Sequence, residues 1–242
     1  MKKAVKPVIP HCTQGTHKGR TMLKRNTKKK RKRSALREFG IAIFLAILIR
    51  GTLVQAYHIP SGSMEDTLLE GDYVLGDKLT FGTQIPDRVP ILNTKLPSFR
   101  VPGFSTPQPG DLVIFEFPRD ESRDFIKRCI AVEGQTVEIK NKIVYVDGKR
   151  FENPEGVKHE DPRVEDKQHS PRDNYGPSTV PPGHIFVMGD NRDSSYDSRF
   201  WGMVSMEKVK AHPLFIYYSW DSQKSLWNIF QKIRWSRLGL LE

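Results

Sequence analysis

The sequence of 242 residues contains few cysteines, and its apolar runs are short. Two cysteines, Cys12 and Cys129, are too few for a disulfide framework, and no Cys and His residues have the spacing of a zinc site. The longest apolar run, at 39–49, has 11 residues, whereas a helix needs about 20 to cross a bilayer. A folded domain must therefore depend on its apolar core, and we expect neither a metal nor another cofactor.

Acidic residues are almost absent from the first 38 positions, which hold 14 lysines and arginines against one acid, Glu38. The rest of the chain holds 25 basic and 27 acidic side chains, so the net charge of +11 belongs to an N-terminal tail. Such a basic arm can bind nucleic acid, but no nucleic-acid motif follows it, and we expect no nucleic-acid partner. A basic cluster directly before an apolar helix instead marks the cytoplasmic side of a membrane and attracts anionic lipid.

The apolar run predicts one N-terminal transmembrane helix over residues 39–57, provided that the helix tolerates Arg50 and two other polar residues near its outer end. The tail, residues 1–38, is then cytoplasmic, and everything after residue 57 lies outside. On this topology Cys12 and Cys129 cannot pair. Two alternatives remain open, a cleaved signal peptide and a buried helix of a soluble domain.

Short apolar or alternating runs rich in Val, Ile, Phe and Tyr follow the apolar stretch, separated by Pro-Gly and Asp-Gly turns. They predict a mainly β domain. Two proline-rich stretches, 81–110 and 149–183, predict irregular excursions over the surface. The aromatic and basic residues of 227–237 fit either an amphipathic element on lipid or a helix packed on the domain. The predicted strands are 72–79, 111–117, 124–132, 136–140, 142–147, 184–190 and 214–220.

The segment YHIPSGSMED, at 57–66, contains two serines, Ser61 and Ser63, just after the apolar stretch. A serine hydroxyl is a poor nucleophile near neutral pH and needs a base within hydrogen-bond reach. No histidine stands in a recognisable catalytic context, and SGSM is not a G-x-S-x-G elbow because Glu65 occupies the position of the last Gly. If this segment is catalytic, its base must be another type of residue.

A lysine held neutral is the other candidate base. Lys127 lies in the strand pattern DFIKRCIAV, where alternation puts it on the face of Phe125 and Cys129, with Arg128 on the opposite face. Burial disfavours the ammonium form, so it lowers the pKa of a lysine and lets the amine accept a proton. The alternative is an ordinary surface lysine, because alternation alone does not say which face is inward.

A polar segment, GDNRDSSYDSRFWG at 189–202, follows the last but one predicted strand. Its aspartates do not match the D-x-[DN]-x-[DN]-G pattern of a calcium loop. The pattern alone favours a capped turn stabilised by pairing between aspartate and arginine.

Taken together, the ordered segments IPSGSM, GDYVLGDKL, PGDLVIFEF, KRCIAVEG and GDNRDSSYDSR resemble those of the bacterial type I signal (leader) peptidases. These are Ser-Lys enzymes that remove signal peptides from exported proteins. The resemblance runs from about residue 41 to the end. Two departures are visible: Asp66 stands where the family often has Pro, and Glu133-Gly134-Gln135 where it often has Pro-Gly-Asp.

The resemblance implies a role for each matching residue. Ser63 is then the nucleophile and Lys127 the general base. Ser61 is a side-chain donor to the oxyanion, and Ser195 orients the lysine. Asp197 and Arg199 form a supporting pair. The other supporting residues are Arg128, Gly189, Asp190, Asn191 and Arg192.

The resemblance also implies an architecture and a substrate. We expect a β-barrel-like catalytic core with an inserted smaller β subdomain, preceded by the transmembrane helix. We expect a monomer in the bacterial cytoplasmic (inner) membrane that acts on its outer, periplasmic face. Its partners are anionic lipid and preproteins, cut after small-x-small (A-x-A) sites. The expected divisions are the tail 1–38, the anchor 39–57, the core 58–134, the insertion 135–183, and the core with a membrane-proximal C-terminal segment 184–242.

Two other functions remain as alternatives. One is a non-enzymatic, membrane-tethered β-domain assembly factor, in which Ser63 and Lys127 are merely packed. The other is a self-cleaving Ser-Lys protein of the repressor type. That function requires an N-terminal DNA-binding domain, and a basic tail with an apolar stretch stands in its place.

Overall fold

The computed structural model describes residues 35, 37–46, 53–84, 100–222 and 229–241, and the chain divides into two units, Met1–Ile47 and Leu48–Glu242. In the first unit residues 37–46 are helical, and the large apolar side chains of this helix are exposed. Among the helices described, none combines the length and apolarity that crossing a bilayer requires. Most of the basic tail, Cys12 and Arg50 lie outside the described residues.

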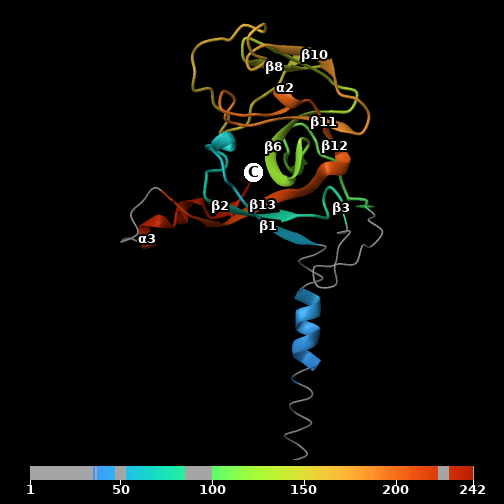
Figure 1. Cartoon of the computed structure of the whole chain (residues 1–242), viewed down its shortest axis with the longest axis vertical. Coiled ribbons are helices and arrows are strands. Elements are labelled where there is room, and N and C mark those ends of the chain that lie inside the picture. The colour runs from blue at the N-terminus through green and yellow to red at the C-terminus, as the bar shows by residue number, and fades with distance from the viewer. Residues whose placement is uncertain (1–34, 36, 47–52, 85–99, 223–228, 242) are drawn as a thin grey trace, which may run out of the picture. The chain divides into compact units, whose positions relative to one another are not determined.

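The second unit confirms the predicted mainly β fold (Figure 1). Each of the seven predicted runs contains a strand, and the described strand pairs are antiparallel. The main sheet has the strand order β1 (Val54–His58), β2 (Asp72–Asp77), β13 (Val209–Ser219), β5 (Leu112–Phe117), β6 (Asp120–Val132), β11 (His184–Met188) and β12 (Val204–Ser205), and β14 (Gly239–Leu240) pairs with β13.

The two ends of this strand order, β1 and β12, do not pair with each other within the described ranges. Closure of the main sheet into a barrel-like core therefore stays a prediction.

A second sheet comes from residues between β6 and β11 in the sequence, inside the range 135–183. It begins with a hairpin whose two turn residues, Asn141 and Lys142, have φ of 48° and 71°. Turns of this kind match the right-handed twist of the strands they join. In Figure 1, β8 and β10 lie at one end of this unit and β1, β2 and β13 at the other. The strand order is β10 (Tyr175–Thr179), β7 (Thr136–Lys140), β8 (Ile143–Val146) and β9 (Lys149–Arg150).

Two short strands, β3 (Thr83–Gln84) and β4 (Arg100–Val101), pair with each other separately. They lie within the proline-rich stretch 81–110, of which residues 85–99 are outside the described ranges.

The predicted helix over 39–57 is wrong at its C-terminal end. Residues Val54–His58 form strand β1, which pairs with β2 from Val54↔Asp77 to His58↔Tyr73. Polar residues interrupt the apolar run here, and a ladder to β2 satisfies the backbone while burying Tyr57. The segment that precedes the serines is therefore a strand of the β domain.

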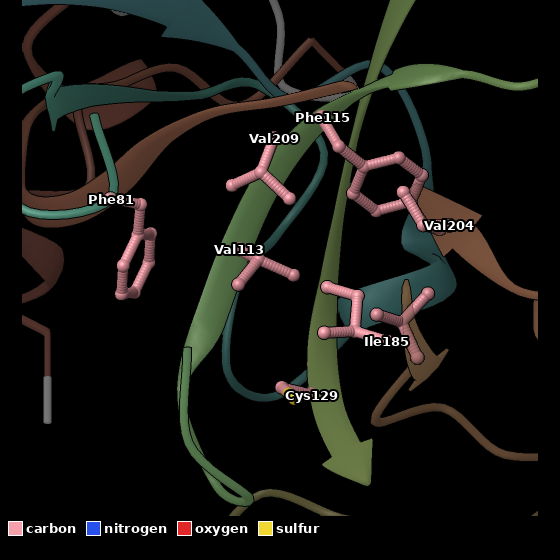
Figure 2. Packing of buried hydrophobic residues seen from close by; sticks show 8 residues of the cluster. Phe81, Val113, Phe115, Cys129, Ile185, Val204 and Val209 are labelled. Atoms are coloured by element: carbon pink, nitrogen blue, oxygen red, sulfur yellow. The ribbon is translucent and has the colours of Figure 1, made fainter. Parts of the chain in front are cut away.

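The core lies between the central strands of the main sheet. Figure 2 shows Val113 and Phe115 of β5, Cys129 of β6, Ile185 of β11 and Val209 of β13 pointing toward one another. All are at most 1% exposed, and full burial of such a side chain contributes about 1.5–3 kcal/mol. The thiol of Cys129 is free and buried, which raises its pKa to about 12. Cys129 is therefore a member of the apolar core.

Strand β13 joins the two halves of the main sheet. Its first residues, Val209 and Ala211, pair with β5, and residues 212–219 pair with β2. Register shifts interrupt both ladders, and such bulges bend and twist a strand. Through β13, the segment that carries Ser63 is held against the strands that carry Lys127.

The C-terminal segment is attached to the β domain by side chains. Lys232 of α3 (Ile229–Lys232) is buried, with its Nζ 5.0 Å from the centre of the Trp220 ring. Arg237, which ends the 3₁₀ helix η3 (Trp235–Arg237), donates to Asp72 Oδ2 at 2.8 Å. Trp235 is 61% exposed. These contacts fit the packed alternative for 227–237, while Trp227 is outside the described residues and contact with lipid stays a prediction.

Candidate active site

Ser63 lies in the 3₁₀ helix η1 (Gly62–Met64), between β1 and β2. The turn is anchored by Met64, which is 2% exposed and packs with Leu68 and Val74. The carbonyl of Ser63 accepts a hydrogen bond from the backbone N–H of Asn191 at 3.2 Å. The hydroxyl faces the cleft, with Ser61 Oγ 3.5 Å from Ser63 Oγ.

Lys127 reaches Ser63 from β6. Its Nζ is hydrogen bonded to Ser63 Oγ, although 64 positions separate the two residues in the sequence. Lys127 is 3% exposed, and Nζ lies 5.7 Å from the centre of the Phe125 ring. Burial lowers the pKa of this amine to about 8, although the carboxylates of Asp197 and Asp190 act in the opposite direction. A far larger fraction of Lys127 than of an ordinary lysine is therefore neutral close to physiological pH, although the protonated form still predominates there.

Arg128, the next residue on β6, is buried as well. Both faces of β6 are covered at this point, because the loop that follows β11 packs on the side that carries Arg128. Arg128 forms a two-pronged ion pair with Asp190, from Nε to Oδ1 at 2.8 Å and from Nη2 to Oδ2 at 2.7 Å. Asp190 also accepts from Thr67 Oγ1 at 2.6 Å, and Arg128 Nη1 donates to the carbonyl of Gly110. This ion pair ties the lysine strand to the chain that follows Ser63.

A second buried ion pair closes the loop. Asp197 is the N-cap of α2 (Ser198–Trp201), and it accepts from Arg199 Nε at 2.8 Å and from the N–H of Gly189 at 3.1 Å. Burial alone would raise the pKa of Asp197, but Arg199 outweighs it and lowers the pKa below its usual value. Arg199 also donates to the carbonyl of Arg192. No group of three or more metal-ligating side chains occurs in the part of the chain that the structure describes.

Gly189 permits a close approach at the centre of the site. A Cβ at this position would lie 2.3 Å from Ser195 Oγ and 2.4 Å from the carbonyl oxygen of Ser63. Ser195 is 5% exposed, and its side chain is one of the groups that lower the pKa of the Asp197 carboxyl. The structure therefore brings Ser195 beside Ser63, but without the expected hydrogen bond to Lys127.

Asn191 and Arg192 complete the loop, and both are at most 2% exposed. Asn191 Nδ2 donates to Glu65 Oε2 at 3.3 Å. Arg192 Nη2 donates to Asn153 Oδ1 at 2.9 Å, and burial together with the nearby Arg199 lowers its pKa to about 10. The loop therefore contacts the segment after Ser63 on one side and the long excursion after β9 on the other.

Three contributors to the site were not predicted: Thr67, the carbonyl of Gly110, and Lys158. The backbone of Lys158 donates to the carbonyl of Asp190 at 2.9 Å and accepts from the N–H of Arg192 at 3.0 Å. Thr67 follows the SGSM segment closely and could have been considered. Lys158 lies in a polar stretch with no pattern, so only the folded loop reveals it.

The cleft beside Ser63 has a volume of about 470 Å³. One wall is formed by residues 57–65 and the other by residues 123–127, and Glu160, Asn191, Ser194 and Tyr196 line one part of it. Strand β1 is the first strand of the sheet order, and β6 pairs with β11 only from Arg128 onward. Both walls therefore present strand edges to which an extended peptide can add.

Comparison with known proteins identifies the class. The family described as signal peptidase, peptidase S26, matches residues 32–218 of this chain. A β fold with an alcohol and a buried amine in contact agrees with that description, and the protein is a serine peptidase, a hydrolase. The chain belongs to the signal peptidase family, peptidase S26, and its relatives place it among the bacterial type I enzymes.

The relatives match along most of the chain. Signal peptidase I of Aquifex aeolicus is 34% identical over 239 residues, which cover 77% of this chain and 84% of the relative. Signal peptidase I of Pseudomonas aeruginosa is 32% identical over 218 residues, with coverage of 78% and 73%. The probable signal peptidase I-1 of Synechocystis is 32% identical over 206 residues, with coverage of 82% and 83%. A crystal structure of a signal peptidase I from Enterococcus faecalis is 28% identical, covers 44% of this chain and 96% of its own, and gives a TM-score of 0.36.

Proposed function

We propose that the protein removes N-terminal signal peptides from exported preproteins, with Ser63 as nucleophile and Lys127 as general base. The observation that carries this proposal is the hydrogen bond between Ser63 Oγ and an amine whose burial lowers its pKa to about 8. A neutral amine in this position can take the hydroxyl proton during attack on a carbonyl. It can then give that proton to the leaving amine.

Negative charge forms on the carbonyl oxygen during attack, and the site has donors for it. We assign this role to the hydroxyl of Ser61, 3.5 Å from Ser63 Oγ, together with the backbone N–H of Ser63. Loss of one such donor typically lowers the rate about 10²- to 10³-fold. Ser195 is assigned to orient Lys127, since its side chain is buried and its hydroxyl lies beside the carbonyl of Ser63.

The support for the remaining residues is their placement around this pair. Arg128 and Asp190 hold the lysine strand to the 189–192 loop, and Asp197 and Arg199 hold that loop to α2. In this proposal the main sheet curls into a barrel-like core around the cleft, and residues 135–183 form the inserted subdomain.

The substrate is proposed to lie as an extended strand between β1 and β6. Side chains of a strand alternate between two faces, so pockets recur at every second residue. Apolar residues such as Ile59 and Ile126 line the cleft near Ser63, and they fit small side chains at alternate positions. This arrangement supports cleavage after small-x-small sites of preproteins.

We further propose that the chain is anchored in the bacterial cytoplasmic membrane by the apolar segment ahead of β1, with the β domain on the outer face. The basic tail before this segment and the exposed apolar side chains of the helix over 37–46 support this orientation.

The experiment that tests the catalytic proposal is preprotein cleavage by the full chain in detergent. Ser63→Ala and Lys127→Ala should each abolish detectable cleavage, whereas Ser122→Ala and Lys140→Ala, which alter exposed residues of the same types, should cleave at the parental rate. Cleavage at the parental rate by either site variant contradicts the mechanism and favours a non-enzymatic role for the pair.

A further inference from the structure

The cleft beside Ser63 is lined by side chains of two kinds. The part that we call the apolar end is lined by Tyr57, Ile59, Phe125 and Ile126, from β1, the chain just after it and β6, and Arg123 and Asp124 lie along the same β6 wall. The other is lined by polar side chains of the 189–196 loop and of the segments next to it: Glu65, Glu160, Asn191 and Ser194. Ser63 is hydrogen bonded to Lys127 and, through its carbonyl, to Asn191, so it lies where the two ends meet.

Asn191, which lines the polar end, has a buried acceptor that is unused in the described structure. Its backbone N–H donates to the carbonyl of Ser63 at 3.2 Å, and its Nδ2 donates to Glu65 Oε2 at 3.3 Å. These two bonds fix the orientation of the amide. Oδ1 is buried and accepts no hydrogen bond from any described residue, although the side chain lines the cleft and is 2% exposed. A buried acceptor without a donor costs free energy that a bound N–H group would recover.

Acidic side chains surround this acceptor. Lys158 Nζ lies 3.2 Å from Glu65 Oε2, 3.1 Å from Glu160 Oε1 and 3.5 Å from Asp66 Oδ2. Three carboxylates therefore share one ammonium, which leaves this end of the cleft negative. The side chains of Glu65 and Glu160 are 43% and 47% exposed, so they are accessible to a ligand in the cleft.

We propose that Asn191, Glu65 and Glu160 form the subsite for the first residues of the mature chain, those that follow the scissile bond. Asn191 Oδ1 accepts a main-chain N–H, and the two carboxylates favour a basic over an acidic side chain at the second mature residue. This inference rests on the proposed function, because it requires that Ser63 is the nucleophile and that the apolar end binds the signal peptide.

The chemistry of the reaction indicates which N–H is bound. The nitrogen of the first mature residue is the leaving group, and it receives its proton from Lys127. The first main-chain N–H that can donate a hydrogen bond to Asn191 Oδ1 throughout the reaction therefore belongs to the second mature residue. A side chain on that residue lies next to Glu65, because Asn191 and Glu65 are themselves hydrogen bonded.

The first test uses the full chain in detergent with fluorogenic peptides that carry Ala-x-Ala before the scissile bond. The peptides differ only at the second mature residue, which is Lys, Gln or Asp. For the parent enzyme, kcat/KM should be highest for the Lys peptide, intermediate for Gln and lowest for Asp. The ratio of kcat/KM for the Lys peptide to that for the Asp peptide should be about ten at low salt and should decrease at high salt. Glu65→Gln and Glu160→Gln should each lower this ratio about three-fold.

Asp66→Asn is the matched control. It removes the same charge one position from Glu65, but Asp66 is not part of the cleft lining, and Asn tolerates its φ of 77°. This variant should change the ratio less than two-fold. The charge assignment is overturned if the parent enzyme cleaves the Lys and Asp peptides with equal kcat/KM. It is also overturned if Asp66→Asn and Glu65→Gln lower the ratio of the two values equally.

The second test concerns the N–H group. N-methylation of the second mature residue should lower kcat/KM of the parent about ten-fold, and this penalty should fall below two-fold in Asn191→Ala. Equal penalties in the two enzymes overturn the role of Asn191. If no peptide is cleaved, or if Ser63→Ala cleaves like the parent, the proposed function itself has failed. If cleavage depends on Ser63 but does not respond to the second mature residue, to its N-methylation or to the subsite variants, only the subsite is refuted.

Discussion

At the scale of single residues, the site depends on placing one amine where water does not reach it. Lys127 is 3% exposed, and burial is the main reason for its lowered pKa. Its hydrogen-bond partner in the described structure is Ser63, and the nearby carboxylates of Asp190 and Asp197 are engaged by Arg128 and Arg199.

The pH dependence of cleavage should follow this amine. Only the neutral form accepts a proton, so kcat/KM should rise with pH and level off above a pKa of about 8. Below that pKa, each unit of pH should lower kcat/KM about ten-fold. A pH–rate profile of a good peptide substrate gives the value, and an acid limb near 6.5 would point to a histidine instead.

The stability of the protein should respond to the same group. The pKa of Lys127 is lower in the folded state than its ordinary value of 10.5, so the unfolded chain binds more protons between about pH 8 and 10.5. Stability should therefore increase with pH across this window. Lys127→Met should be more stable than the parent at pH 7, by on the order of 1–3 kcal/mol, and the gap should narrow toward pH 10. Urea unfolding at several pH values measures this gap, and a constant gap would contradict the assigned pKa.

Gly189 should not tolerate a side chain. Gly189→Ala places a methyl group within 2.4 Å of both Ser195 Oγ and the carbonyl oxygen of Ser63, so one of them has to move. We expect a loss of about 1–3 kcal/mol in stability together with a large loss of activity. Gly239→Ala, where no atom lies within 4 Å of the new Cβ, is the control. Normal turnover by Gly189→Ala would show that the close approach is not needed.

At the scale of elements, the site depends on loops held by buried charges. The excursion after β9 is attached to the 189–196 loop by Asp193, which accepts from Lys142 Nζ at 2.6 Å and from the N–H of Asp161 at 2.7 Å. Burial alone would raise the pKa of Asp193, but these bonds lower it to about 2. The attachment is therefore complete at neutral pH, and it weakens as the pH falls from about 4 toward 2.

Removing this carboxylate should release the excursion. Asp193→Asn loses the ion pair with Lys142 and should lower stability by about 1–3 kcal/mol. Limited proteolysis should then cut residues 155–170 faster than in the parent. Asp166→Asn, a substitution in the same excursion, serves as the control. Equal rates of cutting in the parent and Asp193→Asn would mean that other contacts hold the segment.

The sequence predicted the strands better than it predicted their surroundings. β2, β5 and β6 follow from alternation and β-branched residues, but β1 was assigned to a helix because its residues continue an apolar run without a turn. The motifs named the residues that the fold brings together around Ser63 and Lys127. They did not reveal that Arg128 is buried or that Lys158 contacts the 189–192 loop, because both facts depend on what packs on β6.

At the scale of the whole molecule, orientation across the membrane is the main prediction. The basic tail should stay inside, and the β domain should lie outside. Protease added to spheroplasts should therefore digest the chain after residue 57 and spare the tail. Protection of the β domain would reverse the proposed orientation. Labelling with an impermeant thiol reagent provides an independent check, since Cys12 should be unreactive until the membrane is permeabilised.

The role of β13 has a consequence for how the enzyme comes into being. The alcohol and the amine belong to segments that are linked in the sheet through this strand. Without residues 209–219 the chain could still form the Arg128–Asp190 ion pair and the bond from Asn191 to Ser63, but the ladders that join β2 to β5 would be missing. We therefore expect the two reactive groups to come into register only once this strand has taken its place in the sheet.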